Sequence, residues 1–70
     1  MIALGNTDKP LFVKFVDKIN PRIDYTDDIS EALPYNDTWI AQQELDFLNF
    51  HFKAERPKLK GMKVIDTRAE

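Results

Sequence analysis

The sequence predicts a small α+β domain in which one helix covers one face of a three-stranded sheet. Two segments with the residue pattern of strands, 11–17 and 22–26, precede a helical pattern from about 38 to 49, and a third strand-like segment follows at 62–66. The chain has 70 residues and contains neither an internal repeat nor a linker-like stretch, so we expect one domain spanning residues 1–70. The expected element order is therefore β-β-α-β.

The first nine residues precede the first strand pattern and show no periodicity of their own. We therefore expect a loosely ordered leader over residues 1–9, and the same at the other end over residues 67–70. The leader lacks the basic start and apolar stretch of a signal peptide. No apolar run approaches the roughly 20 residues of a membrane-spanning helix. These features predict no membrane partner and a cytoplasmic location.

The first predicted strand is rich in β-branched and aromatic residues and carries apolar side chains on both faces. Strict alternation places Leu11, Val13 and Phe15 on one face and Phe12 and Val16 on the other. Apolar residues on both faces are typical of a central strand rather than an edge strand. This strand is therefore expected in the middle of the sheet.

The second predicted strand, residues 22–26, alternates between polar and apolar side chains, with Ile23 and Tyr25 on one side. This pattern predicts a half-buried strand, antiparallel to the first and joined to it by a turn that ends at Pro21. Residues 27–33 can form a single helical turn, which the next proline ends.

The main helix begins after a credible N-cap, either Asn36 or Asp37. One apolar stripe runs along it at spacings of four, three and four residues, formed by Ala41, Leu45, Leu48 and Phe52. Ile40 and Phe47 widen that stripe on one flank. Residues 48–53 also alternate as a strand would, so the sequence leaves the end of the helix open.

If the first strand runs up, the second runs down, the helix runs up and the third strand runs down. The third strand is then antiparallel to the first and can lie beside it. The predicted strand order is therefore 2-1-3, counted along the chain, with an antiparallel or mixed sheet and the helix on one face. The other face, which is expected to carry Phe12 and Val16, would stay open. An uncovered apolar face is a candidate surface for a protein partner or for a homodimer.

Trp39 and Phe50 do not fit the apolar stripe of the helix. At about 100° per residue they point nearly opposite to Ala41 and Leu45. They are either covered by Tyr35, by the leader or by the loop over residues 58–61, or they form an exposed aromatic anchor of the kind that dominates protein–protein interfaces. The sequence leaves both alternatives open.

The sequence offers little material for catalysis or metal binding. It has no cysteine, one histidine (His51) and two glycines, and no nucleophile motif surrounds its hydroxyl residues. The acidic residues between 24 and 31 lack the ligand spacing and central glycine of a calcium-binding loop. We therefore expect no enzyme, no catalytic residue, no metal site and no cofactor.

Charge is distributed unevenly along the chain. Residues 23–52 hold seven acids and no Lys or Arg, whereas the densest basic run comes directly after them. This run consists of Lys53, Arg56, Lys58, Lys60 and Lys63. Because Phe50 and Phe52 precede it, the run is an alternative contact for single-stranded nucleic acid. The net charge of −2 counts against nucleic acid as a partner.

The stretch from Tyr25 to Tyr35, followed by Asn36-Asp37-Thr38 and a helix, resembles small uncharacterised phage and prophage proteins of Gram-positive bacteria. Residues 64–66 match the closing strand of that group, whereas Gln42 and Gln43 depart from its charged, alanine-rich helix. The resemblance implies a bacterial host cell and a virus-encoded accessory role, and it carries over no catalytic residue.

Together these features predict a non-enzymatic protein–protein interaction module that binds a partner protein or a second copy of itself. The residues expected to bind are Trp39, Phe50, Phe12 and Val16.

Overall fold

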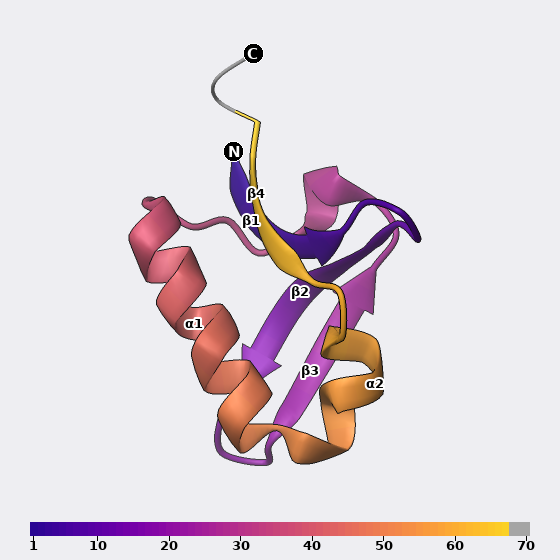
Figure 1. Cartoon of the computed structure of the whole chain (residues 1–70), viewed down its shortest axis with the longest axis vertical. Helices are drawn as coiled ribbons and strands as arrows, with labels where there is room; N and C mark the ends of the chain where they lie inside the picture. Colours follow the sequence, from indigo (N-terminus) through magenta and orange to yellow (C-terminus); the bar gives the residue numbers. More distant parts are fainter. Residues whose placement is uncertain (68–70) are drawn as a thin grey trace.

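A computed structural model of the protein describes residues 1–67. Within them, four strands form one sheet with the order β3-β2-β1-β4, and each neighbouring pair is antiparallel (Figure 1). The strands are β1 (Ile2–Asn6), β2 (Leu11–Asp17), β3 (Arg22–Thr26) and β4 (Lys63–Asp66). Two α-helices, α1 (Thr38–His51) and α2 (Arg56–Leu59), pack on the same core cluster. The α+β class is therefore confirmed, but the three-stranded sheet is not.

The prediction that residues 1–9 form a loosely ordered leader is wrong. Residues 2–6 form β1, which lies between β2 and β4, and the predicted order 2-1-3 lacked this strand. Ile2, Ala3 and Leu4 have no exposed surface. A strand that is covered on both faces shows no polar–apolar alternation, so its sequence carries no periodic signal.

The two ends of the described chain lie side by side. The Thr67 amide donates to the Met1 carbonyl oxygen at 2.9 Å, and the Met1 ammonium donates to the Thr67 hydroxyl at 3.0 Å. The prediction that residues 67–70 are loosely ordered therefore does not hold for Thr67, and its remainder, from residue 68 on, lies outside the described residues.

A β-bulge changes which side chains of β2 face the helix. The pairing with β3 shifts register between Val13 and Phe15. Because a bulge inserts one extra residue, Val13 and Val16 both pack on the core below α1, whereas Phe12 belongs to a separate cluster on the opposite face. The predicted division of this strand into two faces is therefore wrong, and Val16 does not lie on an open face.

The face of the sheet away from α1 is partly closed. A short 3₁₀ helix, Ile29–Glu31, brings Ala32 against Ala3 and Phe12, and Phe12 is only 6% exposed. From there the chain passes to the helix side: the Leu33 amide donates to the Val13 carbonyl and the Tyr35 amide to the Ile2 carbonyl. The prediction that Phe12 is available to a partner is therefore wrong, because this segment covers it.

The predicted stripe of α1 is confirmed. Asp37 is the N-cap, and its carboxylate accepts a hydrogen bond from the Trp39 amide at 2.6 Å. All four residues of the stripe are buried, namely Ala41, Leu45, Leu48 and Phe52. The helix continues to His51, which settles the open question over residues 48–53 in favour of helix followed by a 3₁₀ turn. Within residues 1–67, no helix is long and apolar enough to cross a membrane.

Candidate protein-docking surface

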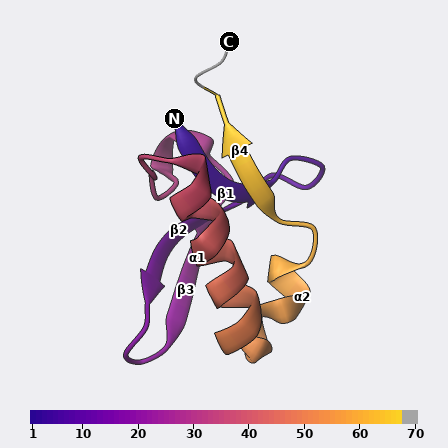
Figure 2. The same ribbon diagram turned by 60° about the vertical axis from the view of Figure 1, so that its left-hand side comes forward.

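Trp39 and Phe50 are exposed on the outer side of α1. Their exposed fractions are 63% and 69%, so neither Tyr35 nor any other segment within residues 1–67 covers them. Eleven positions separate the two residues, which at about 100° per residue turns them to within about 20° of the same direction. In Figure 2, α1 lies in front of the sheet and no ribbon crosses its outer side. The two aromatic side chains therefore mark one free face of the helix.

Gln43 and Asp46 lie between these aromatic residues on the same face, and both are exposed. The Gln42 side-chain amide donates to an Asp46 carboxylate oxygen at 3.0 Å. Within residues 1–67, Gln43 has no hydrogen-bond partner for its side chain. The outer face of α1, defined here by Trp39, Gln43, Asp46 and Phe50, thus has a polar centre and aromatic ends.

Ile40 and Phe47 lie on the flank of α1 beside this outer face, and Phe47 also packs against the core cluster, as the sequence predicted. Ile40 is 52% exposed, so the prediction that it widens the core stripe is wrong. Phe47 is half-buried, and its ring lies 4.3 Å from the ring of His51. The apolar surface of α1 thus extends from Trp39 and Phe50 onto one flank of the helix. The helical angle places Ile40 within about 20° of Phe47, so the residue pattern did not separate the exposed side chain from the half-buried one.

The same flank is held to the β2–β3 hairpin by Lys18. Its ammonium lies 3.1 Å from a Glu44 carboxylate oxygen and 4.5 Å from the centre of the Phe47 ring. A shallow hollow of about 380 Å³ lies beside these groups, and Tyr35 contributes to its lining. The Tyr35 hydroxyl is buried and has no hydrogen-bond partner within the described chain.

Replacing Tyr35 with Phe should stabilise the fold. A buried hydroxyl without a partner loses its hydrogen bonds to water on folding, so its removal is expected to raise the free energy of unfolding by about 1 kcal/mol. Urea denaturation followed by circular dichroism measures this change. A loss of stability in Tyr35→Phe would show that the hydroxyl has a partner in solution.

Both tyrosines of the chain should resist ionisation while it is folded. Burial raises the pKa of Tyr35, to which the charge of Glu44 adds, and burial with the hydrogen bond from the Tyr25 hydroxyl to Glu55 raises the pKa of Tyr25. The unfolded chain releases these protons above about pH 10 and the folded chain retains them. The free energy of unfolding should therefore be unaffected by them below that pH and fall as the pH rises above it.

Absorbance at 295 nm checks this pH dependence because the sequence has only two tyrosines. Phenolate absorbance should appear together with the loss of far-UV circular dichroism. Ionisation of both phenols near pH 10 in a chain that is still folded would contradict the expectation.

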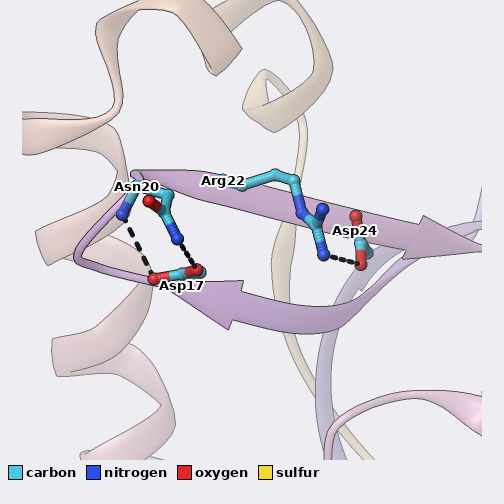
Figure 3. A network of polar contacts seen from close by, with 4 residues as sticks. All are labelled: Asp17, Asn20, Arg22 and Asp24. Atoms are coloured by element: carbon cyan, nitrogen blue, oxygen red, sulfur yellow. Dashed lines mark hydrogen bonds and ion pairs between the residues drawn. The ribbon is translucent and has the colours of Figure 1, made fainter.

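The turn between β2 and β3 presents a further apolar side chain. The Asp17 carboxylate accepts from the Asn20 side chain at 2.8 Å (Figure 3). It also accepts from the Ile19 amide at 2.9 Å, and these hydrogen bonds lower the pKa of Asp17. Ile19, between them, is 91% exposed. The neighbouring ion pair of Arg22 and Asp24, at 3.2 Å, is solvent-exposed and contributes little to stability.

The predicted basic run spans three elements: Lys53 begins a 3₁₀ turn, Arg56 and Lys58 belong to α2, and Lys63 belongs to β4. The Arg56 guanidinium donates to the Asn49 carbonyl oxygen at 3.3 Å. Lys63, the first residue of β4, pairs with Gly5 of β1. Lys58 and Lys60 instead line a hollow of about 500 Å³. The residues around this hollow are Asn6, Asp8, Lys9, Leu11, Pro57, Lys58 and Lys60.

Lys9 joins these two lysines only through the tertiary structure, because it belongs to the turn between β1 and β2. No sequence spacing relates Lys9 to Lys58 and Lys60, so sequence analysis missed it. Within residues 1–67, none of the three ammonium groups has an ion-pair partner. No group of three or more His, Cys, Asp or Glu in that part of the chain could hold a metal ion.

No protein-family model, curated protein or solved structure matches this chain.

Proposed function

We propose that this protein is a non-enzymatic protein–protein interaction module whose docking surface is the outer face of α1. The observation that supports this proposal is the exposure of Trp39 and Phe50 in one direction on one helix. Tryptophan is enriched among the residues that supply most of the binding energy at protein interfaces, and both side chains are large and apolar. A solvated helix face normally carries charged side chains, but Asp46 is the one charged residue among the four that define this face.

The setting of the proposed function comes from the resemblance to prophage proteins. From it we infer an accessory protein, encoded by a phage or prophage, that acts in the cytoplasm of a bacterial host. Of the four residues that the sequence suggested for binding, Trp39 and Phe50 support the proposal, whereas Phe12 and Val16 do not.

Affinity capture from a lysate of the source cells tests this function. The immobilised wild-type chain should retain one or more proteins, which the Trp39→Ala/Phe50→Ala variant should lose. Phe15→Ala is a matched control because Phe15 is an aromatic residue, 46% exposed, on β2 rather than on α1. Equal capture by all three chains, with each one folded by circular dichroism, would contradict the proposal.

A second candidate function is weak binding of nucleic acid through the hollow beside α2. The observation that favours it is the convergence of Lys9, Lys58 and Lys60 around this hollow, where none of the three has an ion-pair partner within residues 1–67. A gel-shift at low salt should then show retardation of single-stranded DNA or RNA, which Lys58→Glu/Lys60→Glu abolishes. The absence of any retardation by the wild-type chain would remove this candidate.

A further inference from the structure

The four residues that define the outer face of α1 have the same spacing whether they are counted from the start or from the end of the helix. Its residues Trp39, Gln43, Asp46 and Phe50 are separated by four, three and four positions. This is the spacing by which one helix packs along another in a coiled-coil-like seam. An aromatic side chain stands at each end and a polar side chain at each inner position.

We propose that the partner of this face is a second copy of the chain, docked with the two α1 helices antiparallel about a two-fold axis that passes between residues 44 and 45. This inference rests on the proposed function and names the partner. In such a pair, Trp39 of each copy lies opposite Phe50 of the other, and Gln43 lies opposite Asp46. The interface then contains two aromatic pairs around two polar pairs.

The polar pairs are chemically complementary. Gln43 carries an amide donor that has no partner within the described chain, and Asp46 carries a carboxylate with acceptor sites beyond the one that Gln42 uses. Across the two-fold axis, the Gln43 amide of each copy can therefore donate to Asp46 of the other. A parallel arrangement would instead place Asp46 opposite Asp46, which is unfavourable.

The charges at the two ends of α1 favour the same orientation. The helix begins after its Asp37 cap and ends at His51, and Lys53 follows closely. Antiparallel docking brings the acidic start of one helix near the basic end of the other and opposes the two helix dipoles. Parallel docking would bring like charges together.

The small size of the domain gives a second copy a physical role. A 70-residue chain without cysteine has no disulfide to support its core, and chains of this size often gain stability through oligomerisation. Docking through α1 would bury Trp39 and Phe50, whose exposed fractions are among the highest of the large apolar residues. No ribbon of the sheet or of α2 lies over the outer side of α1 (Figure 2).

Sedimentation equilibrium between about 1 μM and 1 mM tests the inference. The wild-type chain should be a dimer in the upper part of this range. Trp39→Ala and Phe50→Ala should each weaken the dimer about 30-fold or more, as expected for a residue that contributes about 2 kcal/mol to binding. Phe15→Ala should leave the dissociation constant unchanged, and circular dichroism confirms that each variant is folded.

Substitution of Gln43 tests the antiparallel register. Gln43→Lys places an ammonium opposite Asp46 of the other copy and should tighten the dimer several-fold. Gln43→Glu places a carboxylate there and should weaken it by a similar factor. Equal dissociation constants for these two variants would overturn the register.

A wild-type chain that stays monomeric at 1 mM overturns the second copy as partner. If lysate capture still depends on Trp39 and Phe50 in that case, the proposed function stands with a different protein as the partner. If capture does not depend on them either, the docking surface itself is wrong.

Discussion

Leu4→Ala is expected to lower the free energy of unfolding by about 2–5 kcal/mol, the cost of deleting a fully buried leucine side chain. Leu4 lies in β1 with no exposed surface and packs on the core cluster below α1. Because a single core in a domain this small supplies only about 3–5 kcal/mol, the variant should be largely unfolded at 25 °C. Far-UV circular dichroism without denaturant measures how much of the variant is unfolded, and urea denaturation gives the stability of the wild-type chain.

Ile19→Ala provides the matched control for Leu4→Ala. It deletes a similar aliphatic side chain, but Ile19 is 91% exposed, so the change should stay within about 0.5 kcal/mol. The comparison distinguishes two accounts of residues 1–9. A loosely ordered leader would tolerate both substitutions equally, and an equal effect would show that β1 does not form part of the core.

Gly5→Ala is the second substitution with a large expected effect. A Cβ atom at this position would overlap the Phe12 ring and would lie 2.8 Å from the Leu11 carbonyl oxygen. The backbone of β2 must then move away from β1, and overpacking of this kind costs about 1–3 kcal/mol. Thermal or urea denaturation of the variant measures the cost.

A double-mutant cycle with Phe12→Leu identifies the cause of that loss. The smaller leucine side chain at position 12 leaves room for part of the added methyl group, so the double variant should lose less stability than the two single variants together. Strictly additive losses would show that the Phe12 ring does not lie against Gly5. The backbone contact with Leu11 remains in both cases, and recovery is therefore expected to be partial.

The outer face of α1 could be predicted from the sequence because it depends on the helix alone. Once Asp37 caps the helix and Ala41 and Leu45 face the core, the angle per residue fixes where Trp39 and Phe50 point. The angle per residue does not show whether another segment of the chain covers Trp39 and Phe50. That required the position of every neighbouring element, and the structure leaves both side chains exposed.

Phe12 and Val16 show the opposite case. Strict alternation along the strand placed them together on an open face, but the bulge after Val13 moves Val16 to the helix side, and Ala32 and its neighbours cover Phe12. The bulge depends on how β2 pairs with β3, and the cover depends on where the chain passes after β3. Neither is contained in the residue pattern of the strand itself.

The sequence by itself determined the elements whose pattern arises from a contrast between core and solvent: the strands at 11–17 and 22–26, the main helix, and the α+β class. Only the tertiary structure decided the place of β1, the faces of β2 and the hollow that gathers Lys9 with Lys58 and Lys60. A strand that is buried on both faces, such as β1, shows no alternation between apolar and polar residues. Residues that meet only through the tertiary structure, such as Lys9 and Lys58, have no regular spacing along the chain.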